Sequence, residues 1–408
     1  MLTPLGLFIA GTLVLIQWVE WVAEWLNVSA LKKDPPPGFE DVYDGKKYAR
    51  AQDYTRAKTR FGFVDSSLKL AGLLAFWFLG GFGFMDRFAG SFGFSEIPTG
   101  VIYLGVLFFL NELFSLPFSI YSTFVLEARF DFNKTTPRTF VLDRLKGLLL
   151  TAAIGGPLLA LLLWFFGRLG STAWLWAWGA VTGFTLLLQF VAPSWILPLF
   201  NKFTPLPEGD LRRAIFDYAQ RVGYPLSNLF VMDGSKRSAK GNAFFTGFGK
   251  NKRIALFDTL VEKYSVDELV AVLAHEIGHH KKGHVWKGFA LSALQTGGTL
   301  FVLSLALRWP ALFGAFQVDP SVHAGFAVFG ILFSPVGFIL SLPLHAFSRR
   351  NEFEADRYAA ETLGTGRALA SGLRKLSAES LANLTPHPFY VWLHATHPPL
   401  VERVRALQ

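Results

Sequence analysis

Long apolar stretches alternate with polar connections along most of the chain. Seven stretches reach the length of about 20 residues that a helix needs to cross a bilayer. We predict these spans at Leu5–Trp25, Ser66–Met85, Val101–Leu126, Leu145–Phe166, Thr172–Leu199, Phe289–Trp309 and Val322–Phe347. The pattern therefore indicates a mainly α-helical, polytopic membrane protein.

Two longer polar regions interrupt or follow the spans. In residues 201–288, three strand-like runs precede a helix, and turn signals such as Gly249-Lys250-Asn251 separate them. We predict a short β-meander with strands at Leu229–Asp233, Asn242–Phe248 and Arg253–Leu260. We expect four parts: spans one to five with cytosolic loops (1–200), a small α+β domain (201–288), spans six and seven (289–347) and a C-terminal helical region that completes the site (348–408).

Composition agrees with a membrane protein. Of 408 residues 51% are hydrophobic, including 42 Phe and 12 Trp. The chain has no cysteine, which excludes disulfides, thiolate catalysis and Cys-ligated zinc. The net charge of +9 is spread between apolar spans rather than gathered in one patch, so we expect no nucleic-acid partner.

The distribution of basic residues predicts an orientation. Lys and Arg are frequent between spans one and two and after span three, and scarce after spans two, four and six. By the positive-inside rule the N-terminus lies outside, while residues 201–288 and the C-terminus face the cytosol. We expect a bacterial plasma membrane or the endoplasmic reticulum, with lipid as the surrounding partner.

A His-Glu-x-x-His sequence is the clearest chemical signal in the chain. A capping box at Ser265–Glu268 and apolar residues at helical spacing place it inside a convincing helix. His275 and His279 then share one helix face and can hold one metal ion, and Glu276 can reach a water on that ion. Two solvated histidines on a surface helix are the alternative interpretation.

A zinc hydrolase needs a third protein ligand and one open position. His284 lies nine residues after His275, about 180° around a continuous helix, so we reject it as a ligand. His280 also points away from the ligand face. We interpret both His280 and His284 as interfacial residues beside Lys281 and Lys282.

Two acidic residues after span seven are better candidates. Glu352 and Asp356 have i, i+4 spacing on a predicted helix. Glu352 can bind the metal, and Asp356 can accept the outer N–H of a ligating imidazole. Glu354 is a rival ligand, but it faces elsewhere. A solvated acidic helix face is the alternative.

Together these motifs resemble the integral-membrane M48 metalloproteases, specifically the Ste24-type CaaX prenyl proteases. The resemblance rests on residues 121–127, 132–135, 241–245, 251–260, 275–280, 352–356 and 397–403. It implies one zinc ion per chain on His275, His279 and Glu352, a gluzincin-like domain, and seven helices around a water-filled chamber. It also implies Glu276 as general base.

The resemblance implies three further site residues. Asn242 and His397 would lie near the scissile carbonyl, and Arg403 near the substrate backbone or its C-terminus. An edge strand beside the metal can hold a peptide by strand addition, so we include Phe244 with Asn242 as substrate-binding. A turn residue for Asn242 and a helix-start residue for His397 are the alternatives.

Polar residues inside spans are costly and usually functional. Glu20 and Glu24 lie in span one, and Asn111 and Glu112 lie in the middle of span three. We expect them to face the hydrated chamber.

The predicted function is membrane-embedded zinc metalloendopeptidase activity near the C-terminus of peptide or lipidated protein substrates, with a Glu-activated, zinc-bound water as nucleophile. The resemblance implies that these substrates are prenylated CaaX-type peptides. Alternatives are a broad-specificity quality-control protease, an intramembrane-cleaving zinc protease, and a seven-span receptor or transporter with an incidental motif. The polar setting of the motif argues against intramembrane cleavage. The oligomeric state stays open, a monomer included.

Overall fold

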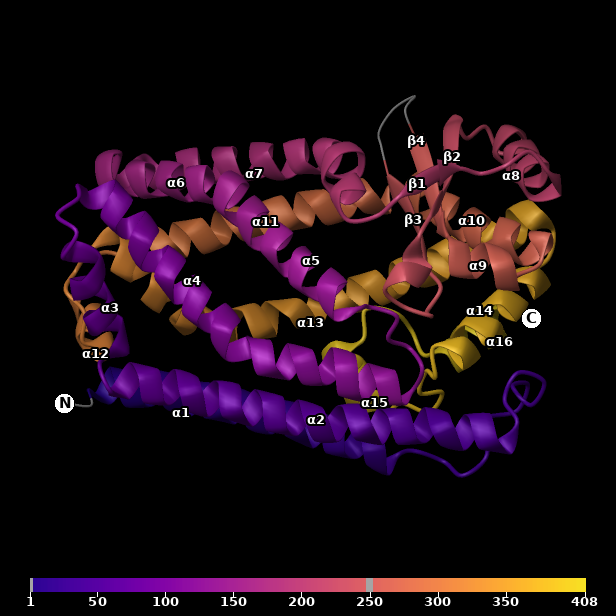
Figure 1. The fold of residues 1–408 in the computed structure, drawn as a ribbon, viewed down its shortest axis with the longest axis horizontal. Helices are drawn as coiled ribbons and strands as arrows, with labels where there is room; N and C mark the ends of the chain where they lie inside the picture. The colour runs from indigo at the N-terminus through magenta and orange to yellow at the C-terminus, as the bar shows by residue number, and fades with distance from the viewer. Residues whose placement is uncertain (1–2, 247–251) are drawn as a thin grey trace.

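Helices make up most of the molecule, as the computed structural model in Figure 1 shows; it describes residues 3–246 and 252–408. Within these ranges, 7 helices are long and apolar enough to cross a membrane. They lie at Pro4–Ser29, Gly45–Phe78, Glu96–Glu127, Pro137–Arg168, Gly170–Leu199, His284–Ala306 and Val322–Leu363. The predicted helical class with seven spans is therefore confirmed.

Several spans contain more than one helical segment. The α-helical parts are α1 (Pro4–Ser29), α2 (Gly45–Phe78), α4 (Glu96–Tyr121), α5 (Pro137–Leu150), α6 (Gly156–Arg168), α7 (Ala173–Val191), α11 (His284–Ala306) and α13 (Val322–Leu363). Wider π-helical turns extend α4, α5 and α7, at Ser122–Glu127, Thr151–Gly155 and Ala192–Ile196. Such turns let a helix change direction without leaving backbone groups unpaired.

The second span differs from its predicted bounds of Ser66–Met85. Helix α2 ends at Phe78, and a separate helix, α3 (Gly81–Gly90), follows. At the other end α2 begins at Gly45, where the Asp44 side chain accepts a hydrogen bond from the Lys47 N–H at 2.6 Å. The polar segment before the span is therefore part of the same long helix.

Helix α3 and the short helix α12 (Pro310–Phe316) lie at the end of the molecule where α1 begins (Figure 1). Trp77 on α2 stacks on Phe316 with ring centroids 4.0 Å apart. Its indole N–H also donates to the Ala315 carbonyl at 2.9 Å. This buried cluster joins α1, α2 and α12 far from the sheet.

The opposite end carries a small sheet surrounded by helices (Figure 1). The strands are β1 (Phe203–Pro205), β2 (Leu226–Met232), β3 (Ala243–Thr246) and β4 (Lys252–Phe257), in the order β1-β2-β4-β3. The helices are α8 (Asp210–Arg221), α9 (Asp258–Lys263), α10 (Val266–Lys281), α14 (Arg367–Glu379), α15 (Pro388–His394) and α16 (Leu400–Leu407).

The predicted β-meander is wrong in its strand order. Strand β2 pairs with β4 in parallel, and β3 forms an antiparallel edge beside β4. After β2 the chain leaves the sheet, and the Ala239 N–H donates to the Phe132 carbonyl at 3.0 Å before β3 begins. The chain then returns on the far side of β4, which a meander does not allow.

The strand bounds also shift. Residues 258–260 of the third predicted strand form the first turn of α9. Residues 247–248 of the second predicted strand and the turn at 249–251 lie outside the described residues. Strand β1 was not predicted, because three residues ending in proline carry little strand signal.

Helix α10 lies in the centre of the larger core, packed against α8, α13 and α14. Its predicted apolar face is buried, with Leu269, Leu273 and Ile277 at most 1% exposed. Helix α13 is one rod of 42 residues that includes the last span and continues beyond it. Groups on the extension of α13 therefore meet α10 within the small domain.

Candidate active site

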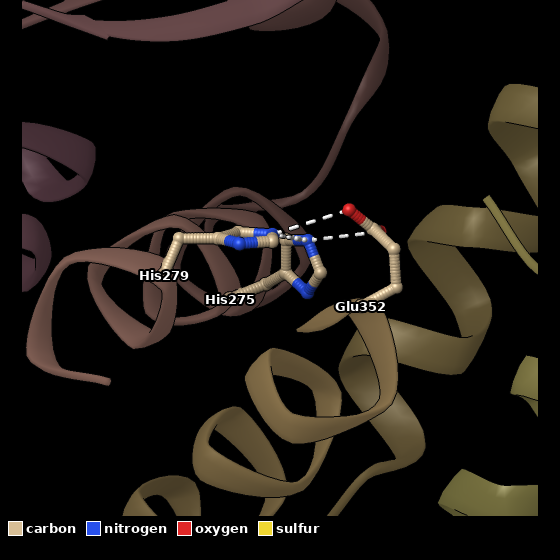
Figure 2. A group of neighbouring side chains, drawn as sticks. All are labelled: His275, His279 and Glu352. Carbon is tan, nitrogen blue, oxygen red and sulfur yellow. Dashed lines mark hydrogen bonds and ion pairs between the residues drawn. The ribbon is translucent and has the colours of Figure 1, made fainter. Parts of the chain in front are cut away.

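The structure brings His275, His279 and Glu352 together (Figure 2). Both imidazoles come from α10 and the carboxylate comes from α13. The two Nε2 atoms are 3.1 Å apart. Glu352 Oε1 lies 3.3 Å from His279 Nε2, and Glu352 Oε2 lies 3.5 Å from His275 Nε2. Three potential metal-ligand atoms thus face one point.

The start of α10 sets the rotation of the two histidines. Ser265 Oγ accepts from the Glu268 N–H at 3.3 Å, and the Glu268 carboxylate accepts from the Ser265 N–H at 3.0 Å. Lys375 Nζ and Ser371 Oγ, both on α14, also donate to Glu268 at 2.7 and 2.6 Å. This predicted capping box is present, and α14 holds it in place.

A glycine allows α10 and α13 to approach closely. A Cβ at Gly278 would lie 3.1 Å from both the Ala355 Cα and the Tyr358 Cδ1. These distances are shorter than ordinary van der Waals contact, so a larger residue would force the helices apart. Gly278 lies between His275 and His279 in the sequence and faces α13. Separating the two helices there would move Glu352 away from both imidazoles.

The geometry fits a zinc ion. With Zn–N distances of about 2.0–2.1 Å, tetrahedral ligand atoms lie about 3.3 Å apart, and the observed separations are 3.1, 3.3 and 3.5 Å. Glu352 Oε2 is buried, and among the described residues it has an ion pair with Arg403 Nη1 at 3.1 Å but no hydrogen bond. A cation would satisfy this oxygen and both facing nitrogens at once.

Asp356 supports the first imidazole. Its Oδ1 accepts from His275 Nδ1 at 2.8 Å, which leaves the lone pair of Nε2 for a metal. Asp356 is 2% exposed. The contact is the one expected from the sequence.

Arg403 on α16 lies behind these two acids. Its Nε and Nη2 donate to the two oxygens of Asp356 at 2.8 and 2.7 Å, and its Nη1 lies 3.1 Å from Glu352 Oε2. Arg403 is only 7% exposed. The guanidinium therefore organises buried carboxylates, while its expected contact with substrate stays a prediction.

The interpretation of His284 as an interfacial residue beside Lys281 and Lys282 is wrong, because its side chain is enclosed by the protein. Its side chain is 4% exposed, its Nδ1 lies 3.0 Å from His279 Nδ1, and its Nε2 lies 3.2 Å from Glu354 Oε2. The predicted angle of about 180° between His275 and His284 assumed one continuous helix from 275 to 284. Gly283 instead adopts φ +71° and separates α10 from α11. His280 is half-buried, with its ring 5.4 Å from that of Tyr224.

Glu276 is half-buried next to the ligand group. Burial raises the pKa of its carboxyl, while the neighbouring His275 and His279 oppose that rise. A carboxylate with a raised pKa is a stronger proton acceptor, as a general base requires.

His397 lies at the edge of the ligand group, with Nε2 at 3.4 Å from Glu352 Oε1 and its side chain 64% exposed. The preceding helix α15 is held by α13. Arg349 Nη1 donates to the carbonyls of Val391 and Ala395 at 3.1 and 2.6 Å, and His345 Nδ1 donates to Leu393 at 3.0 Å. The exposed imidazole can reach a bound molecule.

Asn242 directly precedes the edge strand β3. It is exposed, its Oδ1 accepts from the Ala243 N–H at 2.8 Å, and its carbonyl accepts from the Phe257 N–H at 2.9 Å. Phe244 pairs with Ala255 in the β3·β4 ladder, and its side chain lies outside the described part. Substrate contact by Asn242 and Phe244 stays a prediction.

The motif at 121–127 and 132–135 anchors the start of β3. Glu127, in the π-helical turn after α4, binds Lys240 Nζ at 2.9 Å and the Tyr54 hydroxyl. Lys240 Nζ also lies 4.1 Å from the ring centroid of Phe132. The segment before Asn242 is thereby tied to the membrane helices, a role that spacing within the sequence does not reveal.

Comparisons with known proteins cover the whole molecule. Residues 24–202 match the family model for the CAAX prenyl protease N-terminal region with five membrane helices, and residues 205–408 match peptidase family M48. The crystal structure of S. mikatae Ste24p is similar over 100% of both chains, with a TM-score of 0.95 and 34% identity.

Similar proteins occur in plants, fungi and animals. The CAAX prenyl protease 1 homolog of Oryza sativa is 37% identical over 386 residues, covering 91% of this chain and 90% of the relative. CAAX prenyl protease 1 of Saccharomyces cerevisiae is 36% identical, covering 91% and 88%. The Homo sapiens homolog is 32% identical, covering 98% and 95%. The matched regions include both the candidate membrane spans and the part of the chain that holds His275, His279 and Glu352.

Proposed function

Because this chain belongs to the CAAX prenyl proteases of peptidase family M48, which are membrane metalloproteases, we propose that it hydrolyses a peptide bond near the C-terminus of prenylated peptides or proteins. The observation that carries the proposal is the convergence of His275, His279 and Glu352 beside seven membrane spans. The names of the relatives supply the substrate class.

We assign a single zinc ion to His275 Nε2, His279 Nε2 and the Glu352 carboxylate. When bound, zinc polarises the scissile carbonyl and lowers the pKa of a water molecule. The donor set of two imidazoles and one carboxylate, with separations near those of tetrahedral zinc, supports this assignment.

The protein residues then have distinct tasks. Glu276 accepts the proton of the attacking water and passes it to the leaving amine. His397, exposed at the edge of the group, donates to the oxyanion that forms on the scissile carbonyl. Asn242 and the β3 edge hold the peptide backbone. Asp356 and Arg403 keep the ligands oriented.

Orientation and interior are part of the same proposal. The basic connections support a cytosolic active site and an outside N-terminus, in the endoplasmic reticulum or a bacterial plasma membrane. Hydrated walls around a chamber would accommodate Glu112, which pairs with Arg144 at 2.9 Å, and Glu24, which accepts from Thr59 at 2.8 Å. Both groups lie on long apolar helices.

The test is cleavage of a farnesylated peptide that ends in a CaaX sequence, by the purified full-length protein in detergent. We expect cleavage, loss of cleavage with a zinc chelator and in Glu276→Gln, and normal cleavage in Glu262→Gln, an exposed acid on α9. Equal cleavage of the same peptide without its lipid would instead support a broad-specificity protease. No cleavage of either peptide by metal-loaded protein would contradict the proposal.

A further inference from the structure

The two imidazoles of the ligand group differ in what holds their outer nitrogen. His275 Nδ1 contacts the Asp356 carboxylate directly at 2.8 Å. His279 Nδ1 instead contacts the Nδ1 of His284 at 3.0 Å. A second imidazole thus stands where a carboxylate, carbonyl or water usually supports a metal-binding histidine.

A carboxylate follows on the other side of His284. Its Nε2 lies 3.2 Å from Glu354 Oε2, and Glu354 Oε1 accepts from Arg350 Nε at 3.1 Å. His284, at the start of α11, contacts α10 and α13 through these two residues and has a side chain only 4% exposed, whereas Glu354 is partly exposed at 31%. The four side chains form one continuous series from the ligand group to the surface.

Metal binding at one end determines every proton in this series. His279 binds a metal through an unprotonated Nε2, so its Nδ1 carries the proton and donates to His284. His284 Nδ1 must then be an acceptor, and its Nε2 carries a proton. That N–H donates to Glu354, which can only accept. Each contact has one donor and one acceptor, with no conflict.

We propose that His284 and Glu354 are positioning residues that hold His279 in its Nε2-binding tautomer and ring orientation. The proposal rests on the assignment of a metal to His275, His279 and Glu352, and it adds two residues outside the ligand group. Because His284 is the first residue of α11, the series also links His279 to a membrane span.

Loss of an outer partner typically lowers metal affinity about 10- to 100-fold. We expect this loss in His284→Leu, which removes both the acceptor and the donor, and in Glu354→Ala. The amide of His284→Gln offers one acceptor and one donor, and Glu354→Gln still offers an acceptor, so both should recover most of the affinity.

The experiment measures metal affinity of the metal-free full-length protein by competition with a chelator, together with the visible absorption of its Co²⁺-substituted form. We expect His284→Leu and Glu354→Ala to weaken binding and to shift the Co²⁺ bands. Since Glu354 acts through His284, the double variant should bind no more weakly than His284→Leu alone. Glu361→Ala, an exposed acid on the same helix α13, is the control.

A role in packing alone predicts additive losses, unchanged Co²⁺ bands and no recovery with Gln, and these results would overturn the proposal. Wild-type affinity in both His284→Leu and Glu354→Ala would overturn it as well. If His284→Leu does not fold, Glu354→Ala and His284→Gln decide the question, because Glu354 is partly exposed. If the variants show the expected changes in metal affinity but the wild-type protein does not cleave prenylated peptide, the proposed substrate is rejected and the roles of His284 and Glu354 are retained.

Discussion

Replacing Arg403 by Met is expected to destabilise the small domain and to weaken metal binding. The guanidinium donates two hydrogen bonds to Asp356 at 2.8 and 2.7 Å and lies 3.1 Å from Glu352. Both acids are buried, at 2% and 5% exposure. Methionine fills part of the same space but leaves two neighbouring carboxylates without their cation.

The expected magnitude follows from the burial of this pair. Removing one partner of a buried ion pair costs about 3–5 kcal/mol, because the remaining charge is left uncompensated. For a domain of about 150–250 residues, a loss of about 3–5 kcal/mol in the free energy of unfolding lowers the melting temperature by about 6–20 °C. Because Arg403→Met is also expected to bind metal more weakly, the loss of stability should be larger with zinc present than in the metal-free protein.

Thermal unfolding in detergent, followed by tryptophan fluorescence with and without zinc, measures the effect. Arg403→Lys keeps the charge but not the bidentate contact, so it should lie between wild type and Arg403→Met. Arg405→Met, on the exposed face of the same helix α16, is the control. Wild-type melting and metal affinity in Arg403→Met, with only KM increased, would refute this reasoning and favour the substrate contact expected from the sequence.

Three other substitutions test separate parts of the site. Glu276→Gln should keep its metal in elemental analysis and lower kcat about 100- to 10,000-fold, as loss of a general base does; unchanged turnover would exclude that role. Gly278→Ala should separate α10 from α13 by a few tenths of an ångström and cost about 1–3 kcal/mol, with weaker metal binding than in a Gly288→Ala control. Burial alone would raise the pKa of Glu268, but hydrogen bonds from Lys375 and Ser371 hold it below its usual value. The ionised Glu268 should stabilise the folded protein fully above about pH 4.3, the pKa of Glu in the unfolded chain, and this stabilisation should be lost as pH falls through the lowered pKa of the folded state. The melting temperature of Glu268→Gln should therefore depend less on pH in this acidic range than that of wild type.

Features that depend on neighbouring residues were predictable from the sequence. The length of each apolar stretch predicted seven spans, and the capping box with its apolar periodicity predicted helix α10. The i, i+4 spacing predicted that His275 and His279 share a face, and that Glu352 and Asp356 share another. These properties follow from helix geometry and bilayer thickness, which act within one element.

Features that depend on contacts between elements required the tertiary structure. The parallel pairing of β2 with β4 arises because the intervening segment first binds the loop after α4, a contact between residues about 100 positions apart. His284 reaches His279 only because Gly283 ends one helix and turns the chain into the next. Arg403 meets Asp356 because α16 packs beside α13. Amino-acid order specifies which groups one helix presents, whereas only the packed fold determines which group from a distant element completes each hydrogen bond.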